Sequence, residues 1–98
     1  MSSVTFNRLA ALELAEAVEF YDQARHGLGD EFLQEVERAI AFLDRYPEAA
    51  PKVGRRVRKL ILPRFPYALI YRYIEPAQTR ILAVAHLKRR PRYWARRH

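Results

Sequence analysis

The chain has no cysteine among its 98 residues, and it contains only three glycines and one methionine. The absence of cysteine excludes disulfides, thiolate metal ligands and a cysteine nucleophile. The three histidines, His26, His86 and His98, lie far apart in the sequence, so we expect no metal site. A chain of this length has no room for a separate cofactor domain. We therefore predict one domain over residues 1–98 that uses no cofactor.

Long apolar runs are also lacking. No stretch approaches the roughly 20 apolar residues that span a bilayer. The first eight residues lack the basic start and the apolar core of a signal peptide. Half of the residues are hydrophobic and 30% are charged, which is typical of an ordinary globular domain. We expect a cytoplasmic protein without a membrane partner.

Acidic residues are nearly absent from the second half of the chain. Residues 1–50 carry ten acids and four arginines, whereas residues 51–98 carry fourteen Lys or Arg residues and one acid, Glu75. The formal charges of the halves are therefore −6 and +13, which give the net +7 of the whole chain. Fifteen of the eighteen basic residues are arginines, whose planar guanidinium binds phosphate and carboxylate through paired hydrogen bonds. This asymmetry predicts an anionic partner, either nucleic acid or an acidic protein segment.

Two amphipathic helices are predicted in the acidic half. Asn7 can cap a helix from Arg8 to about Arg25, in which apolar residues recur at helical spacing. Gly27 suits the left-handed position that ends a helix. A second helix begins at Asp30, carries one continuous apolar stripe and ends before Pro47. The acidic side chains of both helices are expected to face solvent.

The β-prone runs lie at residues 4–6, 57–62, 67–74 and 80–86. The centre of the last run has no polar residue, which is typical of a central strand covered on both faces. The order β-α-α-β-β-β predicts an α+β fold, with a helical hairpin packed on one face of a small twisted antiparallel sheet. We expect the other face to stay at least partly open and residues 88–98 to form a basic C-terminal tail.

Two residues near the end of the last strand are candidates for catalysis. Strict alternation places Leu82, Val84 and His86 on one face of this strand. Metal-independent RNA cleavage needs a base for the 2′-hydroxyl, cations around the phosphate and an acid for the leaving oxygen. His86 could serve as base or acid, because its unperturbed pKa is about 6.5. Tyr93 could serve only if neighbouring arginines lowered its pKa from about 10.

These residues also have a structural interpretation. A histidine at a strand end is often held by a hydrogen bond, and Tyr93 and Trp94 could lie back on the sheet and cover apolar surface. The candidates for binding phosphate or a protein partner are Arg58, Arg64, Arg72, Lys88, Arg89, Arg90 and Trp94. A basic module that binds nucleic acid without catalysis is a further alternative.

The motifs occur in a distinctive order along nearly the whole chain. After the helical hairpin come Phe65-Pro66-Tyr67, Leu69-Ile70-Tyr71, Val84-Ala85-His86 and Arg90-Pro91-Arg92-Tyr93-Trp94. This set resembles the RelE/ParE superfamily of type II toxin–antitoxin toxins, many of which were first described as plasmid stabilisation proteins. The resemblance implies a growth inhibitor that is neutralised by a cognate antitoxin, with an acidic, amphipathic C-terminal segment of the antitoxin wrapped around the toxin.

The resemblance implies two alternative targets. RelE-like members cut messenger RNA on the ribosome, whereas ParE-like members inhibit DNA gyrase and are not nucleases. Ribosome-dependent RelE-type toxins have an arginine directly after the aromatic residue of the middle hairpin strand, but here Tyr67 is followed by Ala68. Arg72 shares the strand face of Ala68 but lies about 13 Å further along. The resemblance therefore favours the ParE-like branch, with a metal-independent mRNA endonuclease as the alternative in which His86 and Tyr93 are catalytic.

Overall fold

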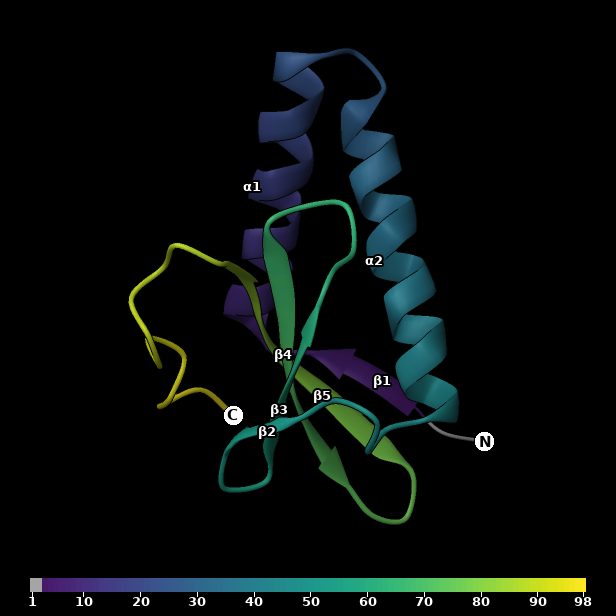
Figure 1. Cartoon of the computed structure of the whole chain (residues 1–98), viewed down its shortest axis with the longest axis vertical. Coiled ribbons are helices and arrows are strands. Elements are labelled where there is room, and N and C mark those ends of the chain that lie inside the picture. The colour runs from purple at the N-terminus through teal and green to yellow at the C-terminus, as the bar shows by residue number, and fades with distance from the viewer. Residues whose placement is uncertain (1–2) are drawn as a thin grey trace.

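Two antiparallel helices form one layer of the computed structural model, which describes residues 3–98 (Figure 1). They are α1 (Arg8–Ala24) and α2 (Leu28–Arg45). The side-chain oxygen of Asn7 accepts hydrogen bonds from the first turn of α1, which confirms the predicted cap. Gly27 joins the helices at φ +90°, in the left-handed region that glycine adopts without steric cost. The predicted helices are confirmed, although α2 begins two residues before Asp30.

The helices approach each other closely near their connection. A Cβ atom on Gly29 would lie 2.5 Å from the carbonyl oxygen of Val18, so only glycine fits at this position without a shift of the backbone. Beyond this contact, the rings of Tyr21, Phe32 and Phe65 pack within 4.9–5.3 Å of one another. The hairpin is thereby fixed to the sheet by an aromatic cluster.

The second layer is a five-stranded sheet with the order β1-β5-β4-β3-β2. Its strands are β1 (Ser3–Phe6), β2 (Lys52–Gly54), β3 (Val57–Ile61), β4 (Tyr67–Ile74) and β5 (Gln78–His86). The predicted α+β fold is confirmed in its class and layering. The sheet is mixed rather than antiparallel, because β1 runs parallel to β5. The short β2, which lies outside the predicted β-prone runs, extends the observed order to β-α-α-β-β-β-β.

A β-bulge in β5 changes which residues face the helices. The pairing between β4 and β5 skips Leu82. Ile81 therefore packs in the core beneath the helices together with Val84, while Leu82 packs on the opposite face with Ala83. Strict alternation grouped Leu82 with Val84 and was wrong at this point, because one extra residue shifts the two-residue period.

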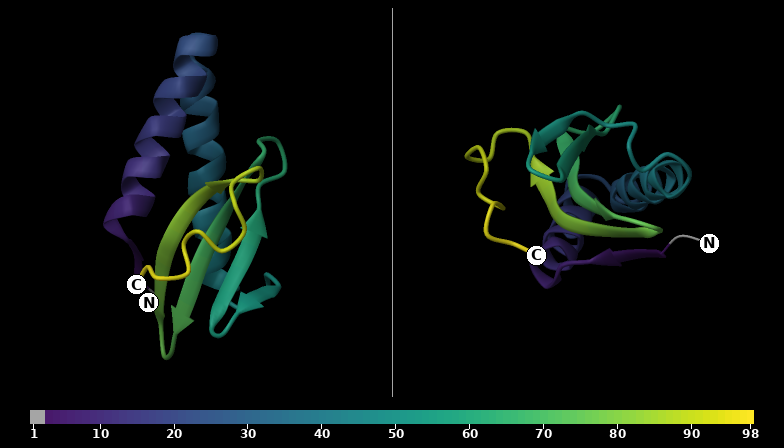
Figure 2. Two further views of the ribbon diagram at one scale, coloured as in Figure 1. Left: turned by 90° about the vertical axis from the view of Figure 1, so that its left-hand side faces the viewer. Right: turned by 90° about the horizontal axis from the view of Figure 1, so that it is seen from below.

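The face of the sheet opposite the helices, here called the second face, is partly covered by the C-terminal tail. Figure 2 shows the tail crossing this face and ending near the start of α1. Trp94 is only 7% exposed and packs in a second core with Val57, Ile70 and Leu82. Less of the second face is open than predicted, because the tail itself covers part of its apolar surface. Among residues 3–98, no helix is long and apolar enough to cross a bilayer.

Candidate functional site

Glu13 of α1 holds the tail against the sheet. Its Oε1 accepts hydrogen bonds from the Val84 backbone N–H at 3.0 Å and from Arg97 Nη1 at 2.8 Å. Its Oε2 accepts from the Tyr93 hydroxyl at 2.8 Å and from Arg97 Nη2 at 3.1 Å. The Glu13 and Arg97 side chains are 15% and 13% exposed. One nearly buried carboxylate thus joins α1, β5 and the tail.

The topology of the sheet explains why β5 needs this carboxylate. Among residues 3–98, β1 pairs with β5 only from Gln78 to Ile81, and the outer edge of β5 beyond Ile81 has no neighbouring strand. There Glu13 accepts the hydrogen bond of the Val84 N–H, and Arg97 Nη1 donates to the Leu82 carbonyl oxygen at 3.1 Å. These side chains satisfy backbone groups that would otherwise be left without partners at a buried edge.

Glu13 was not among the predicted site residues, because the acidic side chains of both helices were expected to face solvent. The spacing of Glu13 from the apolar residues of α1 could have indicated that its side chain is buried. Glu13 lies three residues after Ala10 and four before Ala17, the two buried residues of α1, and therefore on the same helical face. Glu35 of α2 also departs from the expectation, since it is 3% exposed and accepts a hydrogen bond from the Arg64 backbone N–H.

The environment of Tyr93 opposes a role in proton transfer. Burial, the hydrogen bond to Glu13 and the negative charge of Glu13 raise the pKa of Tyr93 well above its usual value, and Arg89 and Arg97 offset this only in part. The Arg89 guanidinium lies 3.9 Å from the centre of the Tyr93 ring. The condition under which Tyr93 could transfer a proton, a pKa lowered below about 10 by neighbouring arginines, is therefore not met, because burial and the Glu13 carboxylate outweigh Arg89 and Arg97.

The raised Tyr93 pKa predicts a loss of stability in alkali. The neutral phenol stabilises the fold fully below the unfolded-state pKa of about 10, and this contribution disappears as the pH rises through the higher folded-state pKa. We expect the melting temperature to fall above about pH 10, and to fall less steeply for Tyr93→Phe. Thermal melts between pH 8 and pH 12 test this, with Tyr46→Phe at an exposed position as the control. Identical alkaline slopes for wild type and Tyr93→Phe would contradict the prediction.

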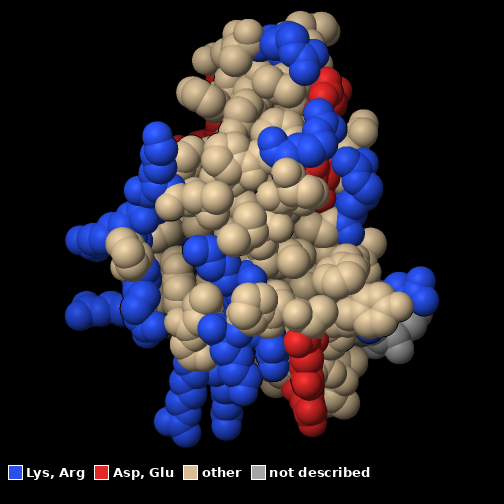
Figure 3. All heavy atoms as spheres, viewed as in Figure 1, with Lys and Arg blue, Asp and Glu red and all other residues tan. Residues whose placement is uncertain are grey.

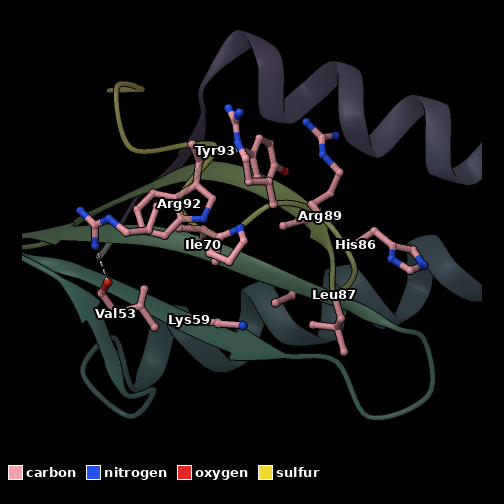
Figure 4. A pocket seen from close by; sticks show the side chains of 13 residues that line it. Val53, Lys59, Ile70, His86, Leu87, Arg89, Arg92 and Tyr93 are labelled. Atoms are coloured by element: carbon pink, nitrogen blue, oxygen red, sulfur yellow. Dashed lines mark hydrogen bonds between the residues drawn. The ribbon is translucent and has the colours of Figure 1, made fainter.

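His86 ends β5 in a hydrogen-bonded position. Its Nδ1 accepts the backbone N–H of Lys88 at 3.0 Å, and its ring packs edge-on against Tyr67 at 5.1 Å. Figure 4 shows the imidazole directed away from Tyr93. His86 and Tyr93 line the same pocket beside the tail, but their side chains point apart and have different hydrogen-bond partners. His86 has the contacts of the structural interpretation.

Two of the candidate arginines are also bound within the fold. Arg58 Nη1 donates to the carbonyl oxygens of Glu48 at 2.9 Å and Ala50 at 2.7 Å, and so fixes the loop after α2. Arg64 Nη2 donates to Glu31 at 3.0 Å. Hydrogen bonds from Arg64 and Arg25 lower the pKa of the Glu31 carboxyl.

The other candidates lie around the tail and the second face. Between them is a pocket of about 210 Å³ with an apolar floor of Ala68, Ile70 and Ala85. Its lining also includes Lys59, His86, Leu87, Arg89, Arg92 and Tyr93 (Figure 4). Arg90 and Trp94 complete the basic and aromatic part of the lining. Lys88 is exposed, and Trp94 of the tail is buried against the sheet. Arg72 lies on β4 outside this pocket. Within residues 3–98, no three His, Cys, Asp or Glu residues are grouped to hold a metal ion.

The fold and the site together define a class of small domains: a helical hairpin on a sheet, with a basic tail fixed across the second face. A family model described as "ParE toxin of type II toxin-antitoxin system, parDE" matches residues 4–91. The chain therefore belongs to the ParE toxin family, and it is the toxin component of a type II toxin–antitoxin system. Such a system implies a cognate antitoxin as its partner.

A solved structure has the same fold. The chain is similar to a protein described as "Chromosomal ParDE TA system from P. aeruginosa", with a TM-score of 0.63 and 21% sequence identity. The match covers 88% of this chain and 96% of that chain. No curated protein matches. The resemblance inferred from the sequence, including the ParE-like branch, is confirmed.

Proposed function

We propose that this toxin arrests growth by binding DNA gyrase and does not cleave RNA. The observation that carries the proposal is that the candidate groups for RNA cleavage have other hydrogen-bond partners within the fold. The Tyr93 hydroxyl donates to Glu13, His86 Nδ1 accepts from the backbone, and Arg58 donates to loop carbonyls. A metal-independent nuclease needs an acid, a base and free cations around one phosphate. Membership of the ParE family supports the same conclusion.

The rigid tail supports a role in protein binding. Its backbone is fixed through Glu13, Trp94 and the bond from Arg92 Nη1 to the Val53 carbonyl oxygen at 3.0 Å. Lys88 and Arg90 are exposed on this fixed segment. A rigid display of charge loses little conformational entropy on binding, which favours association with a protein surface.

For the antitoxin, we propose an acidic, amphipathic C-terminal segment. The pocket beside the tail has an apolar floor that fits one apolar side chain, and Lys59, Arg89 and Arg90 on its lining would meet flanking carboxylates. Apolar anchors surrounded by complementary charge are a common mode of peptide recognition.

Two assays on purified toxin test the choice of target. We expect inhibition of gyrase supercoiling and no cleavage of ribosome-bound messenger RNA. His86→Ala should retain gyrase inhibition within about twofold, as should the control His26→Ala on the exposed connection between the helices. Unaffected supercoiling together with RNA cleavage that His86→Ala abolishes would overturn the proposal in favour of the nuclease alternative.

A further inference from the structure

Arginines form a row across the lower part of the second face. Arg72 of β4 pairs directly with Arg80 of β5 on one side and with Val57 of β3 on the other. Val57 pairs in turn with Gly54 of β2. Arg92 of the tail lies over Gly54, with its Nη1 3.3 Å from where a Cβ atom would be. Directly paired residues share a face of the sheet, so Arg72 and Arg80 lie on the same face as Gly54 and the Arg92 side chain above it. Arg92, Arg72 and Arg80 are here called the arginine row. From β2 to β5 the row spans three strand spacings, or about 14 Å.

The pair of Arg72 and Arg80 in this row is unfavourable for the isolated protein. Like charges directly opposite each other on neighbouring antiparallel strands destabilise a sheet. Arg72 and Arg80 are both half-buried, and neither guanidinium has a hydrogen bond or an ion pair with any residue between 3 and 98. An anion between the two side chains would remove the repulsion.

Backbone conformation gives a second, independent observation. Within the described part of the chain, the non-glycine residues with positive φ are Arg56 at +60° and Arg92 at +61°. Glycine adopts this left-handed region freely, whereas a residue with a Cβ is strained there. Arg92 belongs to the row, and Arg56 lies in the turn between β2 and β3 beside it. The chain thus has positive side chains at two positions where its backbone favours glycine.

The turn and the row lie next to each other. A shallow basin of about 820 Å³ is lined by Lys52, Arg55, Arg56, Arg58 and Arg72, with Glu48 and Glu75 as its acidic residues. Figure 3 shows Lys and Arg side chains gathered over the lower left of the molecule, where this turn and the tail lie. The surface is wide and strongly positive, which suits an extended polyanion better than a small enclosed ligand.

We propose that the arginine row, together with Arg55 and Arg56, binds the phosphate backbone of duplex DNA. A duplex carries one phosphate charge per about 1.7 Å of its axis, so a surface about 14 Å wide meets several phosphates at once. An acidic peptide would also need apolar anchors beside the row, but Val57, which pairs directly with Arg72, is buried with Trp94. The choice of DNA rests on the proposed function, since gyrase acts while holding DNA. The toxin then contacts the DNA in that complex as well as the enzyme.

The test uses purified toxin and a fluorescein-labelled 20-base-pair DNA duplex, without gyrase. Fluorescence anisotropy gives the affinity between 50 and 200 mM salt. The variant is Arg72→Gln/Arg80→Gln, and the control is Arg38→Gln/Arg45→Gln, which removes equal charge from exposed positions on α2. We expect the first variant to bind at least tenfold more weakly at 50 mM salt, with a salt slope smaller by about 1.8, because two phosphate contacts are lost. The control should keep the wild-type slope.

Thermal melting provides a second readout that a merely structural pair would not give. Because Arg72 and Arg80 repel each other, Arg72→Gln/Arg80→Gln should melt at a temperature equal to or above that of the wild type. Absence of duplex binding at 50 mM salt, an equal loss in the control, or tighter binding to an RNA duplex of the same length would overturn the proposal. So would binding of polyglutamate, lost in Arg72→Gln/Arg80→Gln, without binding of DNA. Since gyrase is absent, none of these results depends on the supercoiling assay.

Discussion

Replacing Glu13 by alanine should lower the free energy of unfolding by about 3–5 kcal/mol, as expected when one partner of a buried ion pair is removed. The change leaves the Arg97 guanidinium, which is 13% exposed, without its carboxylate. It also leaves the Val84 N–H and the Tyr93 hydroxyl without acceptors. Small domains have only about 5–15 kcal/mol of net stability, so this one contact accounts for a large part of it. Urea denaturation followed by circular dichroism measures the effect.

Two further variants separate the charge of Glu13 from its packing. Glu13→Gln keeps an acceptor oxygen but loses the charge, so its loss should lie between wild type and Glu13→Ala. Glu16→Ala, one turn away at an exposed position, should change stability by no more than about 0.5 kcal/mol. Equal effects of Glu13→Ala and Glu16→Ala would show that the hydrogen bonds of Glu13 contribute nothing to stability.

Replacing Trp94 by alanine should cost about 3–5 kcal/mol, the usual range for truncating a large buried aromatic side chain. Trp94 is 7% exposed and packs against Val57, Ile70 and Leu82. Its loss would expose these residues, because neither α1 nor α2 packs on the second face. We expect a lower urea midpoint and increased fluorescence of an added apolar dye at low urea concentration.

Leu87 supplies the control for this experiment. It precedes the tail, is 44% exposed and is absent from both cores, so Leu87→Ala should have a small effect. Trp94→Phe retains an aromatic ring and should lose less stability than Trp94→Ala. A Trp94→Ala protein with wild-type stability and no added dye binding would mean that the tail does not cover the sheet in solution.

These two contacts connect stability to function. Glu13 and Trp94 fix the same part of the tail, since Glu13 binds Tyr93 and Arg97 on either side of Trp94. Arg92, which directly precedes this part, forms one end of the arginine row. A variant that releases the tail should therefore weaken every interaction that depends on the position of its arginines. Folding must be checked before any loss of toxicity is assigned to a lost contact with a target.

The local elements could be predicted from the sequence, because their causes are local. The Asn7 cap, the apolar stripe of α2 and the polar turns act over a few residues, so periodicity and capping rules locate them. The charge asymmetry was also visible directly in the composition. Together with the ordered motifs, these features were sufficient for the fold class and the family.

By contrast, the contacts that build the site required the tertiary structure, because they join residues far apart in the chain. The bond from Tyr93 to Glu13 spans 80 residues, and the bulge at Leu82 depends on pairing with β4. The parallel β1 leaves about half of the β5 edge unpaired. Because of this arrangement, Glu13 of α1 can accept a hydrogen bond from the backbone N–H of Val84. The sequence by itself determined the helices, the strands other than β2 and the charge of this toxin. The tertiary structure decided which charges are bound within the fold and which remain for a partner, since burial and pairing depend on neighbours that local patterns do not specify.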